Sequence, residues 1–541
     1  MTINLTDKKI LLIEDNPFMR RSICSMLYTL DIEHVVEANN AGKALAAIRK
    51  RSFDVILADY NLGDGKNSLQ LLEEIRTQNL LPFKTVFIII SGEQTPQMVL
   101  GAMDVKPDEY LAKPFNAHQL SIRLKRNLLL KQLFYPINQA ISDNNFAQAI
   151  HHCDRLLSQN KQHHLILLRK RAELALAIDD LKKAEEIYLQ ILQRRELPWA
   201  RLGLGIIAFR AGRTEQAIDI FNKILQKTPL FMECYDWLSQ IYQHIGQTEK
   251  AEHILLKAVE LSPNAILRQK KLGTTAYQNQ HLEHAENAFK QVIKLGKNSI
   301  HKNSEDFAAL AKTHNDNNKT HEALNVLNAL RNEFRHDSEA EIRALLVESE
   351  VHLHRKAPKQ ADDSLNKALD LSQSIEKSLP KKLLLELSKT CFLHKKESLG
   401  MEILRPLIKN HIDDESFIAE IQHMQKQLDL KGFSDNLIKQ TKKELIDLNN
   451  RGVALFDQGK IEEALNLFED AFERMPHNHT ILLNIIKIQL FKLKTENNQQ
   501  NYQKIQTQLR LAQELGIPQQ KIGQLQIEIN RLQPKHEKYA D

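Results

Sequence analysis

The sequence predicts an α/β domain over residues 1–133, followed by an all-helical array over residues 134–541. In the first part, five short apolar runs alternate with segments of helical periodicity. In the second part, similar residues recur every 34 positions and no strand-like alternation is present. Only 17 Gly and 15 Pro occur among 541 residues, which is little turn punctuation for a strand-rich protein. We therefore expect a parallel sheet covered by helices, and then stacked helix pairs.

Composition favours a folded, cytoplasmic protein. The chain is 42% hydrophobic and 26% charged with a net charge of +6, and it has no long Lys/Arg block of the kind that binds nucleic acid. The N-terminus lacks a signal-peptide core, and no apolar stretch reaches the ~18 residues of a membrane span. The four cysteines are far apart and form no CxxC pair, which argues for reduced thiols and against a zinc site.

The apolar runs of the first part are expected to be strands of a doubly wound parallel sheet. They lie at residues 9–13, 33–37, 55–59, 85–91 and 109–112. The intervening helices are expected near residues 17–30, 41–51, 68–78, 97–103 and 117–133. The last of these is expected to run on into the helical array.

Polar residues stand where these strands end. The central run, Val55-Ile-Leu-Ala-Asp59, leads directly into an aspartate. The carboxyl ends of parallel strands meet along one edge, which is where open α/β sheets bind ligands. Taken alone, each such residue is an ordinary loop acid, helix cap or turn residue. The sheet is nevertheless expected to bring the set together: Glu14, Asp15, Asp59, Ser91 and Lys113.

The order and spacing of these residues carry a family resemblance. The pattern Glu14-Asp15, Asp59, Ser91-Gly92 and Lys113-Pro114-Phe115 resembles the receiver domain of bacterial response regulators. The resemblance covers about the first quarter of the chain. It implies a flavodoxin-like sheet with strand order 2-1-3-4-5.

The carboxylates are expected to bind Mg²⁺ and to accept a phosphoryl group. Three acids in one pocket repel one another, and a hard divalent cation with oxygen ligands offsets that repulsion. Glu14 and Asp15 would hold the ion, whereas Asp59 would be both ligand and nucleophile and would form an aspartyl phosphate. The resemblance also implies that the backbone carbonyl of Asn61 is a metal ligand.

Three further residues are expected to respond to the phosphoryl group. Lys113 would neutralise its charge as an ammonium. Ser91 would donate a hydrogen bond to a phosphoryl oxygen and draw its loop inward. Tyr110 matches the switch aromatic of the receiver family, and its inward turn would reshape the last strand and helix.

The second part resembles the tetratricopeptide repeat family. Pro229 and Pro263 are 34 residues apart, as are Ala251 and Ala285. Small residues are needed where two antiparallel helices approach closely, and proline ends the second helix of each pair. The best match covers residues 198–297.

We predict three sections within the array. These are tetratricopeptide repeats over residues 134–335, degenerate helical repeats over 336–445, and a C-terminal section over 446–541. The C-terminal section contains one clear repeat and a Gln-rich capping helix at about residues 499–532.

The resemblances imply a two-component response regulator with a protein-binding output. A sensor histidine kinase or a phosphotransfer protein would phosphorylate Asp59, and the concave face of the array would bind an unidentified protein partner. Neither an enzyme active site nor a DNA-binding domain is predicted. Two alternatives stay open: a constitutive scaffold whose unphosphorylated receiver mediates homodimerisation, and a regulator that binds nucleic acid through a basic face of the array.

Overall fold

The computed structural model divides the chain into two compact units. The first contains residues 1–143, 152–169 and 184–317, and the second contains 144–151, 170–183 and 318–541. The structure describes residues 3–92, 95, 100–101, 104–375, 379–428, 433–496 and 498–532.

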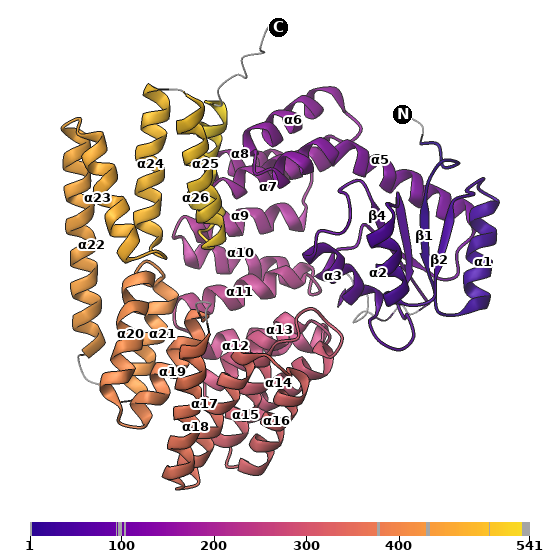
Figure 1. Ribbon diagram of the computed structural model, residues 1–541. Coiled ribbons are helices and arrows are strands. Elements are labelled where there is room, and N and C mark those ends of the chain that lie inside the picture. The colour runs from indigo at the N-terminus through magenta and orange to yellow at the C-terminus, as the bar shows by residue number, and fades with distance from the viewer. Residues whose placement is uncertain are drawn as a thin grey trace. The chain divides into compact units, whose positions relative to one another are not determined.

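A five-stranded parallel sheet with the order β2-β1-β3-β4-β5 is formed by the described part of the first unit (Figure 1). This confirms the predicted fold class and strand order. The central strand β3 pairs with both β1 and β4, so that Ala58 lies opposite Ile13 and Asp59 opposite Ile90. The strands are β1 (Ile10–Ile13), β2 (Val35–Ala38), β3 (Val55–Asp59), β4 (Val86–Ser91) and β5 (Glu109–Ala112).

Helices cover both faces of the sheet. Alternate residues of a strand point to opposite faces, so Leu11 and Ile13 of β1 enter one core whereas Ile10 and Leu12 enter the other. The first core includes α2 (Ala41–Lys50) and α3 (Ser68–Thr77), and the second includes α1 (Pro17–Tyr28) and the start of α5 (Ala117–Ser142). Burial on both faces explains why the strands are continuously apolar. The helix predicted at 97–103 lies mostly outside the described residues.

Helix α5 extends well beyond the sheet. It begins with a capping box between Asn116 and Gln119 and continues for 26 residues, with Pro136 inside it. Leu120 and Leu124 belong to the core of the α/β domain. Near the other end of the helix, Ile137 and Ala140 are buried as well. The helix therefore crosses residue 133 without a break.

The repeats are pairs of helices in which glycine faces an aromatic ring. A Cβ atom added to Gly205 would overlap the ring of Phe221, and one added to Gly273 would lie 2.8 Å from Phe289 Cε1. Ala251 and Ala285, the predicted small positions, are completely buried. The close approach of the paired helices therefore requires small residues.

The repeat helices of the first unit, in order, are α9 (Pro198–Arg210), α10 (Thr214–Lys227), α11 (Met232–His244), α12 (Thr248–Leu261), α13 (Ile266–Gln278), α14 (Leu282–Gly296) and α15 (Ser304–Asp316). Three preceding helices contribute residues to both units: α6 (Phe146–Gln159), α7 (His164–Ala177) and α8 (Leu181–Arg194).

The second unit continues the helical pairs through the section with weak repeat signatures. Gly400 lies against the ring of Phe392, so the small-against-aromatic packing persists there. The helices are α16 (Thr320–Glu333), α17 (Ser338–His354), α18 (Pro358–Ser374), α19 (Lys381–Leu393), α20 (Glu397–His411), α21 (Glu415–Gln427), α22 (Phe433–Asp457), α23 (Ile461–Arg474), α24 (His479–Thr495), α25 (Gln499–Glu514) and α26 (Gln519–Arg531).

The Gln-rich C-terminal segment differs from the prediction of one helix. It forms α25 and α26, which are separated at Gly516 and Pro518. Gly516 has a φ of +72°, a left-handed conformation that ends a helix, and Pro518 occupies the N-cap of α26. The periodic pattern on both sides of this turn made two helices resemble one.

Candidate functional site

The ends of the strands bring the predicted site residues to one edge of the sheet. Glu14 follows β1, Asp59 ends β3, and Ser91 ends β4. The backbone N–H of Lys113, just after β5, donates to the carbonyl oxygen of Ser91 at 2.7 Å. The parallel order of these strands therefore places residues 99 positions apart in one local site.

Three carboxylates form the acidic part of this site. Oxygen atoms of Glu14, Asp15 and Asp59 all lie within 4.8 Å of one another. Glu14 is 2% exposed, whereas Asp15 faces solvent. Burial raises the pKa of Glu14, in spite of a hydrogen bond from Lys113 that lowers it. An all-oxygen donor set of this kind suits Mg²⁺.

Lys113 joins two of these acids. Its Nζ lies 2.8 Å from Glu14 Oε2 and 2.5 Å from Asp59 Oδ1. Burial lowers the pKa of Lys113, but the hydrogen bonds to Asp59 and Glu14 more than offset this, and the pKa is raised overall. The ammonium group is thus held in its charged form between the two carboxylates.

The start of α1 fixes the first acidic loop. Asn16 accepts a hydrogen bond from the backbone N–H of Phe18 at 2.9 Å and so caps the helix. Its own N–H donates to Glu14 Oε1 at 3.3 Å. Arg20 Nη1 donates to the carbonyl oxygen of Glu14 at 2.7 Å. The sequence analysis missed Arg20, because a side chain that binds a backbone carbonyl leaves no pattern of residue types.

The loop after β3 closes around Asp59. The backbone N–H of Asn61 donates to Asp59 Oδ2 at 3.2 Å. Gly63 has a φ of +73°, and a Cβ atom there would lie 3.5 Å from Asp15 Oδ2. Glycine thus lets the loop turn tightly beside the acids. Asn61 thus contacts Asp59 through its backbone N–H, and the metal-ligand role expected for its carbonyl stays a prediction.

Ser91 and Tyr110 lie on the neighbouring strands β4 and β5. Ser91 is buried, and its partner in the parallel register is Ala112. Tyr110 is partly buried and packs against the core that includes α2 and α3. Ser91 therefore ends the strand next to that of Asp59, whereas Tyr110 lies one strand further along the sheet.

Comparison with known proteins agrees with this geometry. Residues 10–125 match the model of the response regulator receiver domain. Residues 194–230, 233–265 and 448–475 match tetratricopeptide repeat models. The chemotaxis protein CheY-3 of Vibrio cholerae is 30% identical over 118 residues, which are 22% of this chain and 89% of that protein.

The chain belongs to the response regulator family.

A second relative matches a stretch of similar length. The transcriptional regulatory protein KdpE of Staphylococcus aureus is 37% identical over 117 residues, and the matched part is 22% of this response regulator and 48% of KdpE. The chain thus spans about half the length of that relative. A TPR repeat-containing protein from Cytophaga hutchinsonii has a similar solved structure, with 16% identity, a TM-score of 0.36, and coverage of 46% of this chain and 98% of that one. Among the described helices, none combines the length and apolar character that a bilayer crossing needs.

The repeats of the response regulator contain a second buried carboxylate, which the sequence analysis missed. Glu252 of α12 accepts hydrogen bonds from Asn279 Nδ2 at 2.6 Å, His281 Nδ1 at 2.8 Å and His284 Nδ1 at 2.7 Å. Burial raises the pKa of Glu252, but these hydrogen bonds lower it overall, and Glu252 in turn raises the pKa of His281. The cluster ties α12 to the start of α14. In the sequence, the cluster is indicated only by the spacing of the two histidines, which are three residues apart.

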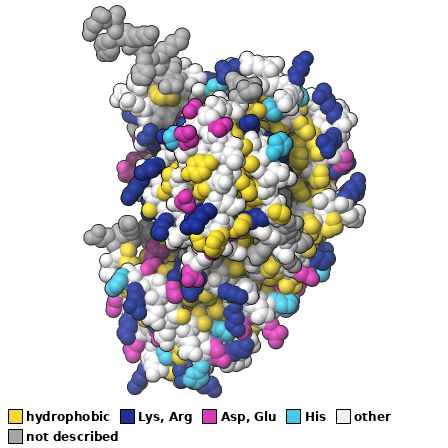
Figure 2. All heavy atoms as spheres, turned by 90° about the vertical axis from the view of Figure 1, so that its right-hand side faces the viewer, with side chains coloured by type: hydrophobic (Ala, Val, Ile, Leu, Met, Phe, Trp, Pro, Cys, Tyr) yellow, Lys and Arg dark blue, Asp and Glu magenta, His cyan; other side chains and the backbone are white. Residues whose placement is uncertain are grey.

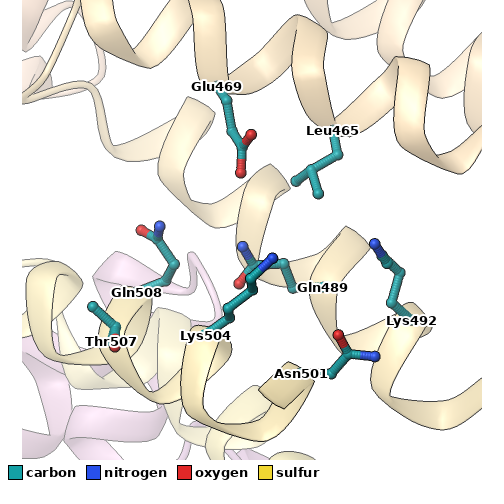
Figure 3. Close-up of a pocket in the computed structure, with 8 residues that line it drawn as sticks. All are labelled: Leu465, Glu469, Gln489, Lys492, Asn501, Lys504, Thr507 and Gln508. Carbon is teal, nitrogen blue, oxygen red and sulfur yellow. The ribbon is translucent and has the colours of Figure 1, made fainter. Parts of the chain in front are cut away.

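A polar cavity lies among α23, α24 and α25 of the second unit (Figure 3). Its volume is about 260 Å³, and its lining includes Glu469, Lys492 and Lys504 together with several amide side chains. Lys492 is also paired with Glu462. The lining combines charged and amide side chains, as is typical of a polar groove between neighbouring helices.

Proposed function

We propose that this response regulator is phosphorylated on Asp59 and that its helical repeats transmit the signal by binding a protein partner. The observation that carries the proposal is the bridge from Lys113 to Asp59 and Glu14, with Asp15 beside it. One cation and three acids are the groups required to hold a divalent ion and a transferred phosphoryl group together.

The residues present fit Mg²⁺. The carboxylates of Glu14, Asp15 and Asp59 and the backbone carbonyl of Asn61 would hold the ion, which would supply positive charge to the oxygens of the transferred group. Glu14 is buried with a raised pKa, so it is incompletely compensated by Lys113 alone. A second positive charge at this point would offset the remaining free-energy cost of keeping the buried Glu14 carboxylate ionised.

Asp59 then acts as the nucleophile. A carboxylate oxygen attacks phosphorus, the P–N bond to the imidazole of the donor histidine breaks as the P–O bond forms, and the donor regains a neutral imidazole. Lys113 exchanges its contact with the Asp59 carboxylate for a phosphoryl oxygen. Ser91 donates a hydrogen bond to another oxygen, and Tyr110 follows the movement of its loop.

The exposed side of α1 is the proposed contact for a histidine kinase or phosphotransfer protein. Phe18 is 77% exposed and Tyr28 is 55% exposed, although both are large and apolar. Phe18 is three residues from Asp15, so a partner that covers it also reaches the acids. Figure 2 views the molecule from the right-hand side of Figure 1, where hydrophobic patches lie among basic and acidic side chains. Exposed apolar surface beside a reactive site is typical of a protein contact.

The repeats favour a protein contact as the output, because stacked helix pairs present long surfaces to partners. A receiver joined to such repeats is typical of regulators that are not enzymes. The two alternatives predict other outcomes: a constitutive scaffold would acquire no acid-labile phosphate, and a nucleic-acid-binding regulator would show affinity for RNA or DNA that falls steeply with salt.

Labelling with acetyl phosphate and Mg²⁺, followed on a phosphate-affinity gel, tests the proposal. The parent is expected to acquire one acid-labile phosphate, and Asp59→Asn none. Asp64→Asn is the matched control, because Asp64 is an exposed acid in the same loop. Labelling of Asp59→Asn at the parent level would exclude Asp59 as the nucleophile.

A further inference from the structure

Within the first unit, the receiver is bound to its own repeats through a buried arginine. Arg268 of α13 is 5% exposed and makes two bidentate contacts. One is with Asp236 of α11, at 2.9 Å from both Nε and Nη2. The other is with Asp104 of the receiver, at 3.1 Å from both Nη1 and Nη2. Bidentate ion pairs between arginine and a carboxylate are strong and require a defined geometry. A buried guanidinium needs such partners, because its charge has lost contact with water.

Other contacts surround this pair. Ser262, just after α12, donates to Asp104 Oδ2 at 3.1 Å. Lys106 Nζ lies 3.0 Å from Glu233 Oε1 on α11. Leu100 of the receiver is buried against three side chains of the repeats: Met232, Tyr235 and Ala258. The repeats thus offer apolar side chains beside a cation, and the receiver contacts both.

We propose that this surface of α11, α12 and α13, here called the Arg268 site, is a docking site for a segment that carries an apolar residue four positions before a carboxylate. The receiver itself supplies the occupant, through Leu100, Asp104 and Lys106. Asp236 accepts from only two of the N–H groups of the buried Arg268 guanidinium, so the remaining N–H groups need a second, acidic partner. Attachment in the same chain gives that occupant a high effective concentration.

A second contact joins the repeats to the loop beside Asp59. Asn298 Nδ2 donates to the carbonyl oxygen of Gly65 at 2.8 Å, and Gln70 Nε2 donates to the carbonyl oxygen of Leu295 at 3.1 Å. Gly65 follows Asn61 by four residues, in the loop between β3 and α3. Docking therefore restrains the segment that has to adjust when Asp59 changes. A coupling between docking and phosphorylation is expected to act equally in both directions. This coupling rests on the proposed function, whereas docking does not.

Distance measurement between two spin labels in the full chain tests the docking. Lys50→Cys in α2 and Lys257→Cys in α12 provide exposed attachment points, and all four native cysteines are buried. The unphosphorylated parent is expected to give one narrow distance distribution. Asp104→Arg places a cation against Arg268, so the distribution is expected to broaden or shift. Asp7→Arg makes the same charge change on an exposed turn and is expected to leave it unchanged.

A charge exchange distinguishes docking from misfolding. Lys106→Glu and Glu233→Lys are each expected to weaken docking at low salt, and the double variant is expected to restore it. The pair is 70% and 40% exposed, so neither change disturbs a core, and the effect is expected to fade at high salt. A parent distribution retained in Asp104→Arg would overturn the docking proposal.

Beryllofluoride with Mg²⁺ then tests the coupling. It is expected to broaden the distribution of the parent but not that of Asp59→Asn, and to bind Asp104→Arg about fivefold or more tightly than Asp7→Arg. If acetyl phosphate labels Asp59 but the distribution and the affinity stay the same, the coupling is wrong and the proposed function stands. If no label is acquired while Asp104→Arg still broadens the distribution, the proposed function is wrong and the docking stands.

Discussion

Two buried glutamates, one in the receiver and one in the repeats, have pKa values that are shifted in opposite directions. Glu14 and Glu252 are each 2% exposed. The pKa of Glu14 is raised, because burial outweighs the help it receives from Lys113. The pKa of Glu252 is lowered, because Asn279, His284 and His281 together outweigh the same burial. The number and kind of donors decide the direction of the shift.

The opposite pKa shifts distinguish two kinds of buried carboxylate. Glu14 can still take up a cation, whereas the hydrogen-bonding capacity of Glu252 is already used within the fold. The carboxylate of Glu252 is satisfied by three side chains from the next helix pair, and its role is to hold two helices together. Glu14 shares the single ammonium group of Lys113 with Asp59, so a further cation can still bind there favourably. Incomplete compensation within a folded, buried setting is a physical mark of a functional site.

The largest expected effect comes from removing the complete cluster. Glu252→Ala leaves three polar side chains without their acceptor, and we expect it to reduce the free energy of unfolding by about 2–3 kcal/mol. Urea unfolding followed by circular dichroism measures this change. Glu260→Ala on the same helix is the control, and its effect is expected to stay within about 0.5 kcal/mol because Glu260 is exposed. Equal effects of the two changes would show that the cluster is not a structural tie.

A smaller effect is expected from Mg²⁺ at the incomplete site. At ten times its dissociation constant, the ion is expected to stabilise the parent by about 1.4 kcal/mol. Glu14→Gln is expected to lose most of this gain, whereas Glu33→Gln, an exposed acid in the same domain, is expected to keep it. Thermal unfolding with and without Mg²⁺ measures the difference. A full Mg²⁺ response in Glu14→Gln would remove Glu14 from the ion site.

The smallest effect is a pH dependence of opposite sign at the two glutamates. Glu14 has a raised pKa, so its contribution to stability is present below the unfolded value of 4.5 and is lost as pH rises through the folded pKa. Glu252 has a lowered pKa, so its contribution is present above 4.5 and is lost as pH falls through the folded pKa.

Urea unfolding between about pH 3 and pH 7 measures this contrast without Mg²⁺, because the Glu252 contribution is lost only below its unfolded pKa of 4.5. As pH falls, the parent is expected to gain stability relative to Glu14→Gln and to lose stability relative to Glu252→Gln. A change of the same sign in both comparisons would contradict the distinction between the two sites.

The sequence was sufficient for those parts of the molecule that a repeating pattern determines. Asp59, Ser91 and Lys113 could be placed together because parallel strands end at a common edge, whatever the loops between them do. Ala251 and Ala285 were recognisable because every helix pair has the same close approach. Local periodicity and sheet topology were therefore enough to predict the fold and to place Asp59, Ser91 and Lys113 at one edge of the sheet.

The remaining features depend on contacts that no local pattern encodes. Arg268 and Asp104 are 164 residues apart and belong to different kinds of structure. Glu252 meets its histidines only because successive helix pairs stack. The turn at Gly516 is a single residue inside a pattern that otherwise continues. Such features follow from tertiary packing and become visible only when the chain is folded.

The continuous helix α5 has a mechanical consequence for this response regulator. At about 1.5 Å per residue, its 26 residues form a rod of roughly 39 Å, and a tilt of roughly 5° at one end moves the other by roughly 3 Å. Leu120 is anchored in the sheet of the receiver, and Ile137 is buried on the same rod beyond it. The connection is therefore a continuous helix and not an extended linker. A cut at residue 133 would therefore fall inside a helix, between the buried residues Leu128 and Ile137.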